Sequence, residues 1–169
     1  MKSILISMQT KRCEFLLNNE MTVEVKKTNP KLETPFKCYI YCTKKYYKKG
    51  DGYFQEKYCG KVIGEFVCDA IISHCEMANA DIAEQQGCIK RENLLEYSNG
   101  KELFGWHISD LKIYDRPKEL SEFKKAGFMS YNDWLYALYP NTHCGYEAWA
   151  RKFNITHPPQ SWCYVEEGI

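Results

Sequence analysis

The stretch "KVIGEFVCDAIIS" (61–73) is the longest apolar segment of the chain that reads as a strand. It is rich in valine and isoleucine, and β-branched side chains fit a pleated sheet well, so it predicts a long buried strand. The whole chain has 169 residues. A chain of this length buries a substantial core without disulfides or metals and most often forms one domain. We therefore expect a single domain, residues 1–169, built around a sheet.

Shorter elements are expected on both sides of this strand. Further strands are predicted at "SILISMQ" (3–9), "EMTVEVKK" (20–27), "FKCYIYCTK" (36–44), 103–115 and 158–166, and short helices at 11–19 and 91–98. Residues 44–61 predict a hairpin excursion around Gly50-Asp51-Gly52. Short strands interrupted by short helices indicate an α+β fold, here a mostly antiparallel β-barrel with short helices.

The character of the chain changes in residues 124–157. Aromatic and leucine side chains recur there at helical spacing: Tyr131, Trp134, Leu135 and Leu138, then Tyr146, Trp149 and Phe153. Side chains three and four residues apart share one face of a helix. We expect two helices, about 128–139 and 145–153, that form a C-terminal helical insert in the barrel.

Composition and charge set limits on the class of protein. The formal net charge is +1, so overall electrostatics favour neither nucleic acid nor a membrane surface. Nine cysteines form no regular disulfide framework. The N-terminal apolar run is too short for a signal peptide, and no segment is long enough to span a bilayer. These features predict a soluble cytoplasmic protein with reduced thiols, no cofactor and no membrane partner.

Five segments together carry a family resemblance: "ILISMQTKRCEFLLNNEMTVEVKKTNP", "YIYCTK", "GKVIGEFVCD", "GWHISDLKIYDRPKELSEF" and "PPQSWCYVEE". They resemble the ASCH-domain family, a PUA-like β-barrel group found in bacteria and their phages. The similarity covers most of 1–123 and 158–167 and leaves out the helical insert. It implies a cleft beside the first helix, which in this superfamily binds RNA, modified bases or nucleotides.

The family signature, Gly-x-Lys-x-x-Glu-x-Arg, aligns with Asn19, Met21, Glu24 and Lys26. The acid is kept, lysine replaces arginine, and the glycine and the first lysine are lost. One branch of the superfamily hydrolyses N4-acetylcytidine with a lysine at the position of Met21 and a threonine at that of Glu24. A thioether serves neither as a base nor as a nucleophile of that kind, so the resemblance implies binding rather than this hydrolysis.

The segment "EMTVEVKK" (20–27) supplies the first candidate site. In a strand, Val23 and Val25 face a core, and Glu24 and Lys26 lie side by side on the other face. Functionally, the carboxylate accepts a hydrogen bond from the amine of a base and the lysine neutralises a phosphate. The alternative is a solvated ion pair worth about 0–1 kcal/mol.

Other candidates share a polar or aromatic side chain near the ends of predicted strands. Ser7, Gln9 and Lys11, where the first strand meets the first helix, predict an anion site or simple capping. Trp106 and His107 predict stacking on a base and a donor, or structural core residues. Gln160 and Trp162 predict base recognition, or only the entry of the last strand.

The excursion is the most basic segment of the predicted surface. Its first half contains Lys44, Lys45, Tyr46, Tyr47, Lys48 and Lys49. Lysines interleaved with tyrosines are typical of surfaces that hold single-stranded nucleic acid. The alternative is a solvated hairpin with a few packed tyrosines.

A metal site is not expected. Cys38 and Cys42 lie four residues apart in a predicted strand, a separation of about 13 Å that is too long for one ion. Three functions stay open: a module that binds RNA, a modified nucleoside or a small nucleotide; a nucleoside hydrolase or ribonuclease; and a protein adaptor or phage counter-defence inhibitor that acts through the helical insert.

Overall fold

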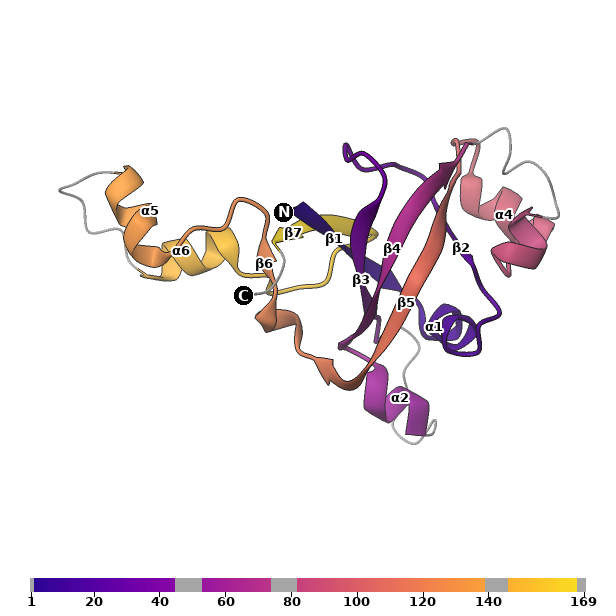
Figure 1. Cartoon of the computed structure of the whole chain (residues 1–169), viewed down its shortest axis with the longest axis horizontal. Helices are drawn as coiled ribbons and strands as arrows, with labels where there is room; N and C mark the ends of the chain where they lie inside the picture. The colour runs from indigo at the N-terminus through magenta and orange to yellow at the C-terminus, as the bar shows by residue number, and fades with distance from the viewer. Residues whose placement is uncertain (1, 45–52, 74–81, 139–145, 167–169) are drawn as a thin grey trace.

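The computed structural model describes residues 2–44, 53–73, 82–138 and 146–166, and it shows one curled sheet with short helices around it (Figure 1). The strands are β1 (Lys2–Met8), β2 (Val23–Lys26), β3 (Phe36–Cys42), β4 (Val62–Ile72), β5 (Phe104–Lys118), β6 (Lys124–Lys125) and β7 (Trp162–Glu166). The helices are α1 (Thr10–Leu17), α2 (Tyr53–Tyr58), α4 (Arg91–Ser98), α5 (Tyr131–Leu138) and α6 (Tyr146–Phe153), with helical turns η1 (Ile82–Gln86) and η2 (Leu120–Glu122). The α+β class is confirmed.

The seven strands pair in the order β2-β5-β4-β3-β1-β7-β6. β1 and β3 are parallel, and every other neighbouring pair is antiparallel. The long apolar stretch that opened the sequence is β4, which lies between β5 and β3. The region 103–115 is one strand, and its pairing with β4 shifts register at several points, which accounts for its broken alternation.

The sheet is not closed into the barrel that was expected. Within the described ranges, β2 pairs with β5 and β6 pairs with β7, so the two edge strands do not meet. β6 has only two residues, too few to form a closing ladder. The sheet instead curls until Lys26 Nζ on β2 reaches the Ser7 carbonyl oxygen on β1, 3.4 Å away. A side chain spans the gap that a backbone ladder would close in a barrel.

The two faces of the sheet bury separate apolar clusters because side chains alternate along each strand. The inner face carries the larger cluster, which includes Ile4, Ile6, Phe66 and Trp106. α1 packs on this inner face through Cys13 and Leu16, the residues that its spacing predicts to be inward. The outer face carries a second cluster: Leu5, Tyr39, Tyr41, Val62, Phe123, Ile155 and Val165.

The predicted hairpin at 44–61 is wrong in its second half, because residues 53–58 form the helix α2. Tyr58 at its end is buried in the inner cluster, and Gly60 follows with a φ of +83°, a conformation that ends the helix. The helix, with Tyr58 packed in the inner cluster, replaces the second half of the expected hairpin. The turn at Gly50-Asp51-Gly52 lies outside the described residues.

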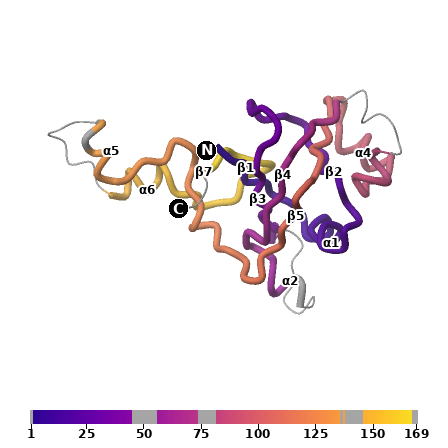
Figure 2. Tube along the Cα trace, in the orientation of Figure 1, coloured from indigo at the N-terminus to yellow at the C-terminus, as the bar shows by residue number. Residues whose placement is uncertain are grey.

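The helices predicted in the insert are present as α5 and α6. They form an arm that projects from the sheet, as the ribbon and the tube both show (Figures 1 and 2). Trp134, Trp149 and Phe153 form a buried cluster of their own within it. The single-domain organisation, with the insert at 124–157, stays a prediction. None of the helices in the described part of the chain is long and apolar enough to cross a membrane.

Candidate ligand-binding site

Two buried charged side chains on the inner face of β2 meet a third, partly buried one from α1. Glu24 accepts a hydrogen bond from Arg12 Nε at 2.9 Å and lies 2.7 Å from Arg12 Nη2. Lys26 Nζ is 3.0 Å from the other carboxylate oxygen of Glu24. Glu24 is 3 % exposed and Lys26 is 5 % exposed. We call Arg12, Glu24 and Lys26 the charged triad.

The alternation of β2 places these side chains as the sequence predicts, with one difference. Val23 and Val25 pack against Ala83 and Leu103 in a small separate cluster. Glu24 and Lys26 therefore point the other way, into the curl of the sheet. The expected ion pair is present, but it is buried rather than solvated, because the curl covers the face that the sequence alone leaves open.

Arg12 is the residue that the sequence reasoning missed. It lies on α1, and its Nη1 donates to the Gly87 carbonyl oxygen at 3.0 Å. Its Nη2 is 2.7 Å from the sulfur of Met21, which is buried beside it. A signal was available, because Arg12 is four residues before the inward Leu16 and so shares its helix face.

The segment that receives Arg12 requires a glycine. A Cβ at Gly87 would come within 2.7 Å of the Ala83 carbonyl oxygen, a backbone atom that has little freedom to move. The glycine allows the segment to pack closely, with the Thr22 N–H donating to the Gln86 carbonyl oxygen at 2.9 Å. Arg12 thus links α1, β2 and the segment after η1.

The triad holds Glu24 ionised. Burial raises the pKa of the Glu24 carboxyl, but the positive charges of Arg12 and Lys26 and their hydrogen bonds outweigh that effect, and the pKa is lowered from its usual value. Two positive charges then stand against one negative charge. One positive charge of the triad is left unmatched within it.

Two tryptophans lie on the same inner face. Trp106 is fully buried, and its indole N–H donates to Asn29 Oδ1 at 3.1 Å. Trp162 on β7 is half-buried, and its indole N–H donates to Thr28 Oγ1 at 3.0 Å. Their ring centroids are 5.8 Å apart. The strand β2 and the loop that follows it therefore bring the triad and the tryptophan pair together.

Ser7 contributes through its backbone. Its carbonyl oxygen accepts from Lys26, and its N–H donates to the Ser161 carbonyl oxygen at 2.8 Å. Its hydroxyl donates to the Pro159 carbonyl oxygen at 2.6 Å. The segment before β7 is thereby attached to the end of β1, beside the triad.

His107 is not part of this group. It alternates with Trp106 along β5, so its side chain lies on the outer face, where its Nδ1 is 2.6 Å from Asp69 Oδ1. The hydrogen bond from His107 lowers the pKa of the Asp69 carboxyl. The sequence placed Trp106 and His107 in one site, and the sheet separates them.

Four other predicted residues are exposed: Gln9, Lys11, Lys44 and Gln160. Gln9 precedes α1 without a capping side-chain hydrogen bond, and the ammonium of Lys11 lies 5.8 Å from the ring of Phe15. A role for them in binding stays a prediction. Lys45, Tyr46, Tyr47, Lys48 and Lys49 lie outside the described residues.

The cysteines and histidines of the described ranges form no cluster suited to a metal. No group of three or more His, Cys, Asp or Glu side chains in that part of the chain is arranged to hold an ion. The cysteines that the structure describes are all free thiols.

Solved structures of an ASCH protein from Zymomonas mobilis resemble this chain. The crystal structure of that ASCH protein gives a TM-score of 0.58 at 16 % identity and covers 98 % of this chain and 88 % of that chain. Crystal structures of two single-residue variants of it also give a TM-score of 0.58, at 16 % and 15 % identity; they cover 99 % and 98 % of this chain and 92 % and 89 % of theirs. No family model and no curated protein sequence matches the chain.

The chain therefore has the fold of the ASCH-domain structures over nearly its whole length. The resemblance drawn from its five sequence segments is confirmed at the level of the fold. The match extends along the whole chain, beyond the two ranges that the sequence resemblance covered.

Proposed function

We propose that this protein is a PUA-like binding domain whose charged triad and tryptophan pair hold RNA, a modified nucleoside or a small nucleotide. The observation that carries the proposal is the unmatched positive charge of the triad. A buried cation is unfavourable unless an anion or several acceptors compensate it. Arg12 and Lys26 each also donate to a backbone carbonyl oxygen, of Gly87 and Ser7 respectively, which compensates part of that charge, and a phosphate group of a ligand would supply the rest.

The three side chains of the charged triad have different roles in the proposed binding. Arg12 is 17 % exposed, the most accessible of the triad, so its guanidinium is the group that meets the ligand. Glu24 occupies the Nε and Nη2 edge of the guanidinium and Nη1 donates one hydrogen to the Gly87 carbonyl oxygen, so a phosphate would approach the remaining N–H of Nη1. Glu24 orients Arg12. Because the Glu24 carboxylate neutralises one of the two positive charges, the charge of Lys26 leaves the site with a net positive charge.

The tryptophan pair supplies the second half of the recognition. Trp162 is the partly exposed member, and its indole N–H is already held by Thr28, which fixes the plane of the ring. A fixed aromatic face stacks on any base at little entropic cost. A ligand with both a base and a phosphate would use both parts of the site.

The hydrolase alternative receives no support from this geometry. Met21 fills the position at which the resemblance implies a catalytic lysine, and its sulfur packs against Arg12. Glu24 is ionised and held by two cations, so its lowered pKa makes it a weak general base. The site binds without reacting.

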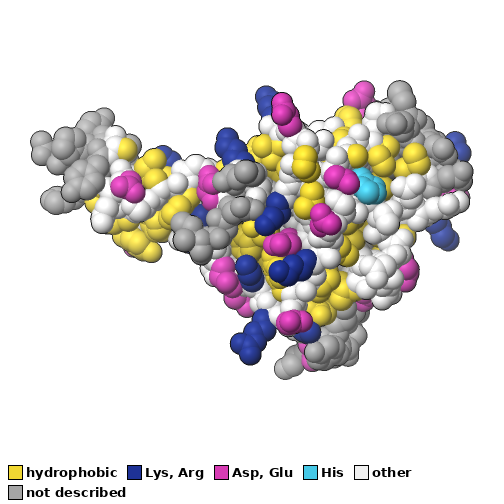
Figure 3. All heavy atoms as spheres, in the orientation of Figure 1, with side chains coloured by type: hydrophobic (Ala, Val, Ile, Leu, Met, Phe, Trp, Pro, Cys, Tyr) yellow, Lys and Arg dark blue, Asp and Glu magenta, His cyan; other side chains and the backbone are white. Residues whose placement is uncertain are grey.

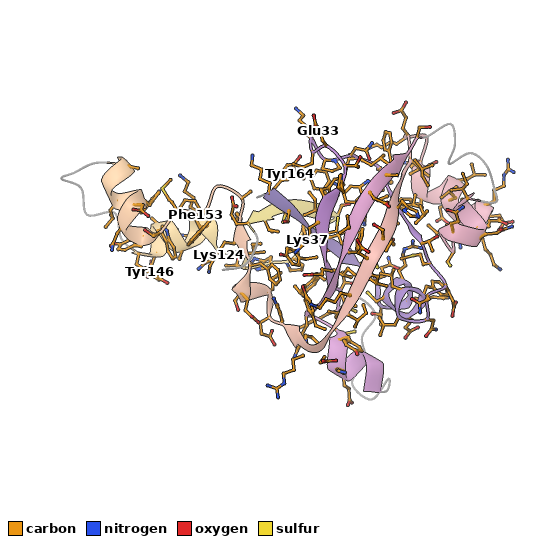
Figure 4. The ribbon with its side chains drawn as sticks, viewed as in Figure 1. Glu33, Lys37, Lys124, Tyr146, Phe153 and Tyr164 are labelled. Carbon is orange, nitrogen blue, oxygen red and sulfur yellow. The ribbon has the colours of Figure 1, made fainter. Side chains whose placement is uncertain are left out.

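The test compares a nucleoside, its 5′-monophosphate and a short single-stranded RNA for binding to the purified protein, by thermal shift and by titration calorimetry. We expect Lys26→Met, which keeps the length of the side chain and removes the unmatched charge, to weaken binding of the phosphate-bearing ligands at least tenfold. Lys37→Met is the matched control, because Lys37 lies on the outer face of β3 (Figure 4). The Lys37→Met variant should bind the same ligands with the affinity of the wild type.

Two results would overturn the proposal. One is an unchanged affinity of Lys26→Met for the monophosphate and the RNA. The other is the absence of any binding by the wild type to all three ligands. Binding that is equal for the nucleoside and its monophosphate would remove the phosphate from the proposal and leave the tryptophans as its basis.

A protein adaptor is the second candidate, and the arm favours it. Hydrophobic side chains gather along the arm on the face seen in Figure 3. Tyr146, which projects from α6, is 60 % exposed, whereas Phe153 of the same helix is buried (Figure 4). If the protein is an adaptor, Tyr146→Asp leaves the fold intact and abolishes association with a partner protein. Unchanged RNA binding by the same variant would show that the two functions are separate.

A further inference from the structure

Two cysteines outside the ligand site lie close enough to react with each other. Cys42 ends β3, and Cys59 follows α2; their sulfur atoms are 4.0 Å apart. The backbone holds the two segments together, because the Gly60 N–H donates to the Cys42 carbonyl oxygen at 2.7 Å. The Cys42 N–H in turn donates to the Lys61 carbonyl oxygen at 2.9 Å. The closeness of the thiols therefore rests on regular backbone pairing.

The surroundings of the pair favour one thiolate over the other. Hydrogen bonds from Cys13, Cys59 and Thr10 lower the pKa of the Cys42 thiol despite its burial. Burial raises the pKa of the Cys59 thiol, although Thr10 Oγ1 lies 3.5 Å from its sulfur. Cys42 is buried and Cys59 is half-buried. Cys59 is thus the member that a small disulfide can reach, and Cys42 is the member with the larger fraction of thiolate.

We propose that Cys42 and Cys59 are a redox modification site, which forms a reversible disulfide when the protein meets a low-molecular-weight disulfide such as oxidised glutathione. A disulfide bond is about 2.05 Å long, so the sulfur atoms must approach by about 2 Å. Rotation of the half-exposed Cys59 side chain provides that movement.

The exchange proceeds in two balanced steps. The Cys59 thiolate attacks one sulfur of oxidised glutathione, which forms a mixed disulfide and releases one glutathione thiolate. The Cys42 thiolate then attacks the Cys59 sulfur, which forms the protein disulfide and releases the second glutathione. The two protein thiols lose two electrons, and the two glutathione sulfurs gain them; the protons leave to solvent.

The bond would join β3 covalently to the segment after α2. It would close the loop of residues 43–58, and closing a loop restricts the unfolded chain more than the folded one. The oxidised protein should therefore be the more stable form. This inference concerns the end of the sheet near α2 and stands independently of the proposed ligand.

The test uses the full chain, incubated with oxidised glutathione and then alkylated. Before alkylation we expect an intact mass lower by two hydrogens without a glutathione adduct. After alkylation we expect two alkyl groups fewer than on the reduced protein, and a tryptic link between residues 38–44 and 58–61. We also expect a thermal midpoint that rises on oxidation and returns on treatment with dithiothreitol. Because Cys38 shares a tryptic peptide with Cys42, Cys38→Ser is the matched control and should form the same link.

The variants trap the intermediate. Cys42→Ser should stop at a stable glutathione adduct on Cys59, and Cys59→Ser should form neither adduct nor link. A wild-type protein that keeps glutathione without an internal link, or links Cys13 or Cys38 in place of Cys42, would overturn the proposal. The wild-type peptide map decides this even if a variant fails to fold.

Discussion

Two pairs of titratable side chains lie on opposite faces of the same sheet, and they differ chiefly in burial. On the inner face, Glu24 of β2 is held by Arg12 and Lys26 and is 3 % exposed. On the outer face, His107 of β5 pairs with Asp69, whose side chain is 44 % exposed. The distances are similar, at 2.7 Å for Arg12 to Glu24 and 2.6 Å for His107 to Asp69.

The comparison shows that the distance between the charged atoms alone does not determine how much an ion pair contributes to stability. An exposed pair exchanges hydration for a contact that water and salt screen, and its net effect is about 0–1 kcal/mol. In a buried pair, removal of one partner leaves a desolvated charge behind, which costs about 3–5 kcal/mol. Four experiments sharpen this contrast.

The largest effect is expected for Glu24→Ala. The substitution leaves Arg12 and Lys26 buried without their common counter-charge, so the free energy of unfolding should fall by about 3–5 kcal/mol. Urea denaturation at neutral pH measures it. Lys37→Ala, which removes the partner of Glu65 from a partly exposed pair 3.8 Å apart, is the control and should lose far less. Equal losses in the two variants would mean that the burial of the triad has no energetic consequence.

The substitution Arg12→Lys keeps the positive charge but removes the paired N–H donors of the guanidinium. A lysine reaches Glu24 through one nitrogen and loses the bond to the Gly87 carbonyl oxygen, so a loss of about 1–3 kcal/mol is expected, the range for hydrogen bonds that involve a charged group. Chemical denaturation gives the value, and Arg151→Lys on α6 is the control. A stability equal to the wild type would show that Arg12 acts only as a point charge.

Acid should weaken the triad. The folded-state pKa of Glu24 is lowered, so its contribution to stability is fully present above the pKa of the unfolded chain and is lost as the pH falls through the folded pKa. The difference in unfolding free energy between the wild type and Glu24→Gln should therefore be largest near neutral pH and shrink below about pH 4. A difference that is constant with pH would contradict the assignment of an ionised Glu24.

The smallest effect is expected on the outer face. Asp69→Asn removes the charge that pairs with His107 in an exposed setting, so the free energy of unfolding should change by about 1 kcal/mol or less. Thermal and urea unfolding at low and high salt measure it, and salt should reduce the small effect further. A loss as large as that of Glu24→Ala would erase the contrast between the two faces.

Much of the secondary structure was predictable because it depends on local spacing. The alternation at 20–27 predicted β2 and the orientation of Glu24, and the helical spacing of Trp134 and Leu135 predicted α5. Two expectations failed where a contact distant in sequence decided the outcome. Residues 53–58 form a helix whose last residue, Tyr58, packs in the inner cluster, and within the described ranges the edge strands β2 and β6 do not pair, so the sheet is not a closed barrel.

The candidate site was predictable in part. Trp106 and Trp162 lie together, a contact that no local pattern predicted, and His107 was grouped with Trp106 although neighbouring residues of a strand face opposite sides. Arg12 was missed because its partners, Glu24 and Gly87, are 12 and 75 residues away. Whether these residues bind a ligand is the question for the titration with Lys26→Met.

The sequence by itself determined which residues form strands and helices, which face of β2 carries the charges, and which fold the chain resembles. The elements and the orientation of β2 follow from periodicity and residue type, which act over a few neighbours, whereas the fold was implied by the resemblance of five segments to the ASCH-domain family. Only the tertiary structure decided that those charges are buried, that Arg12 joins them, and that Cys42 meets Cys59. Burial and long-range pairing depend on how the sheet curls, and no single segment contains that information.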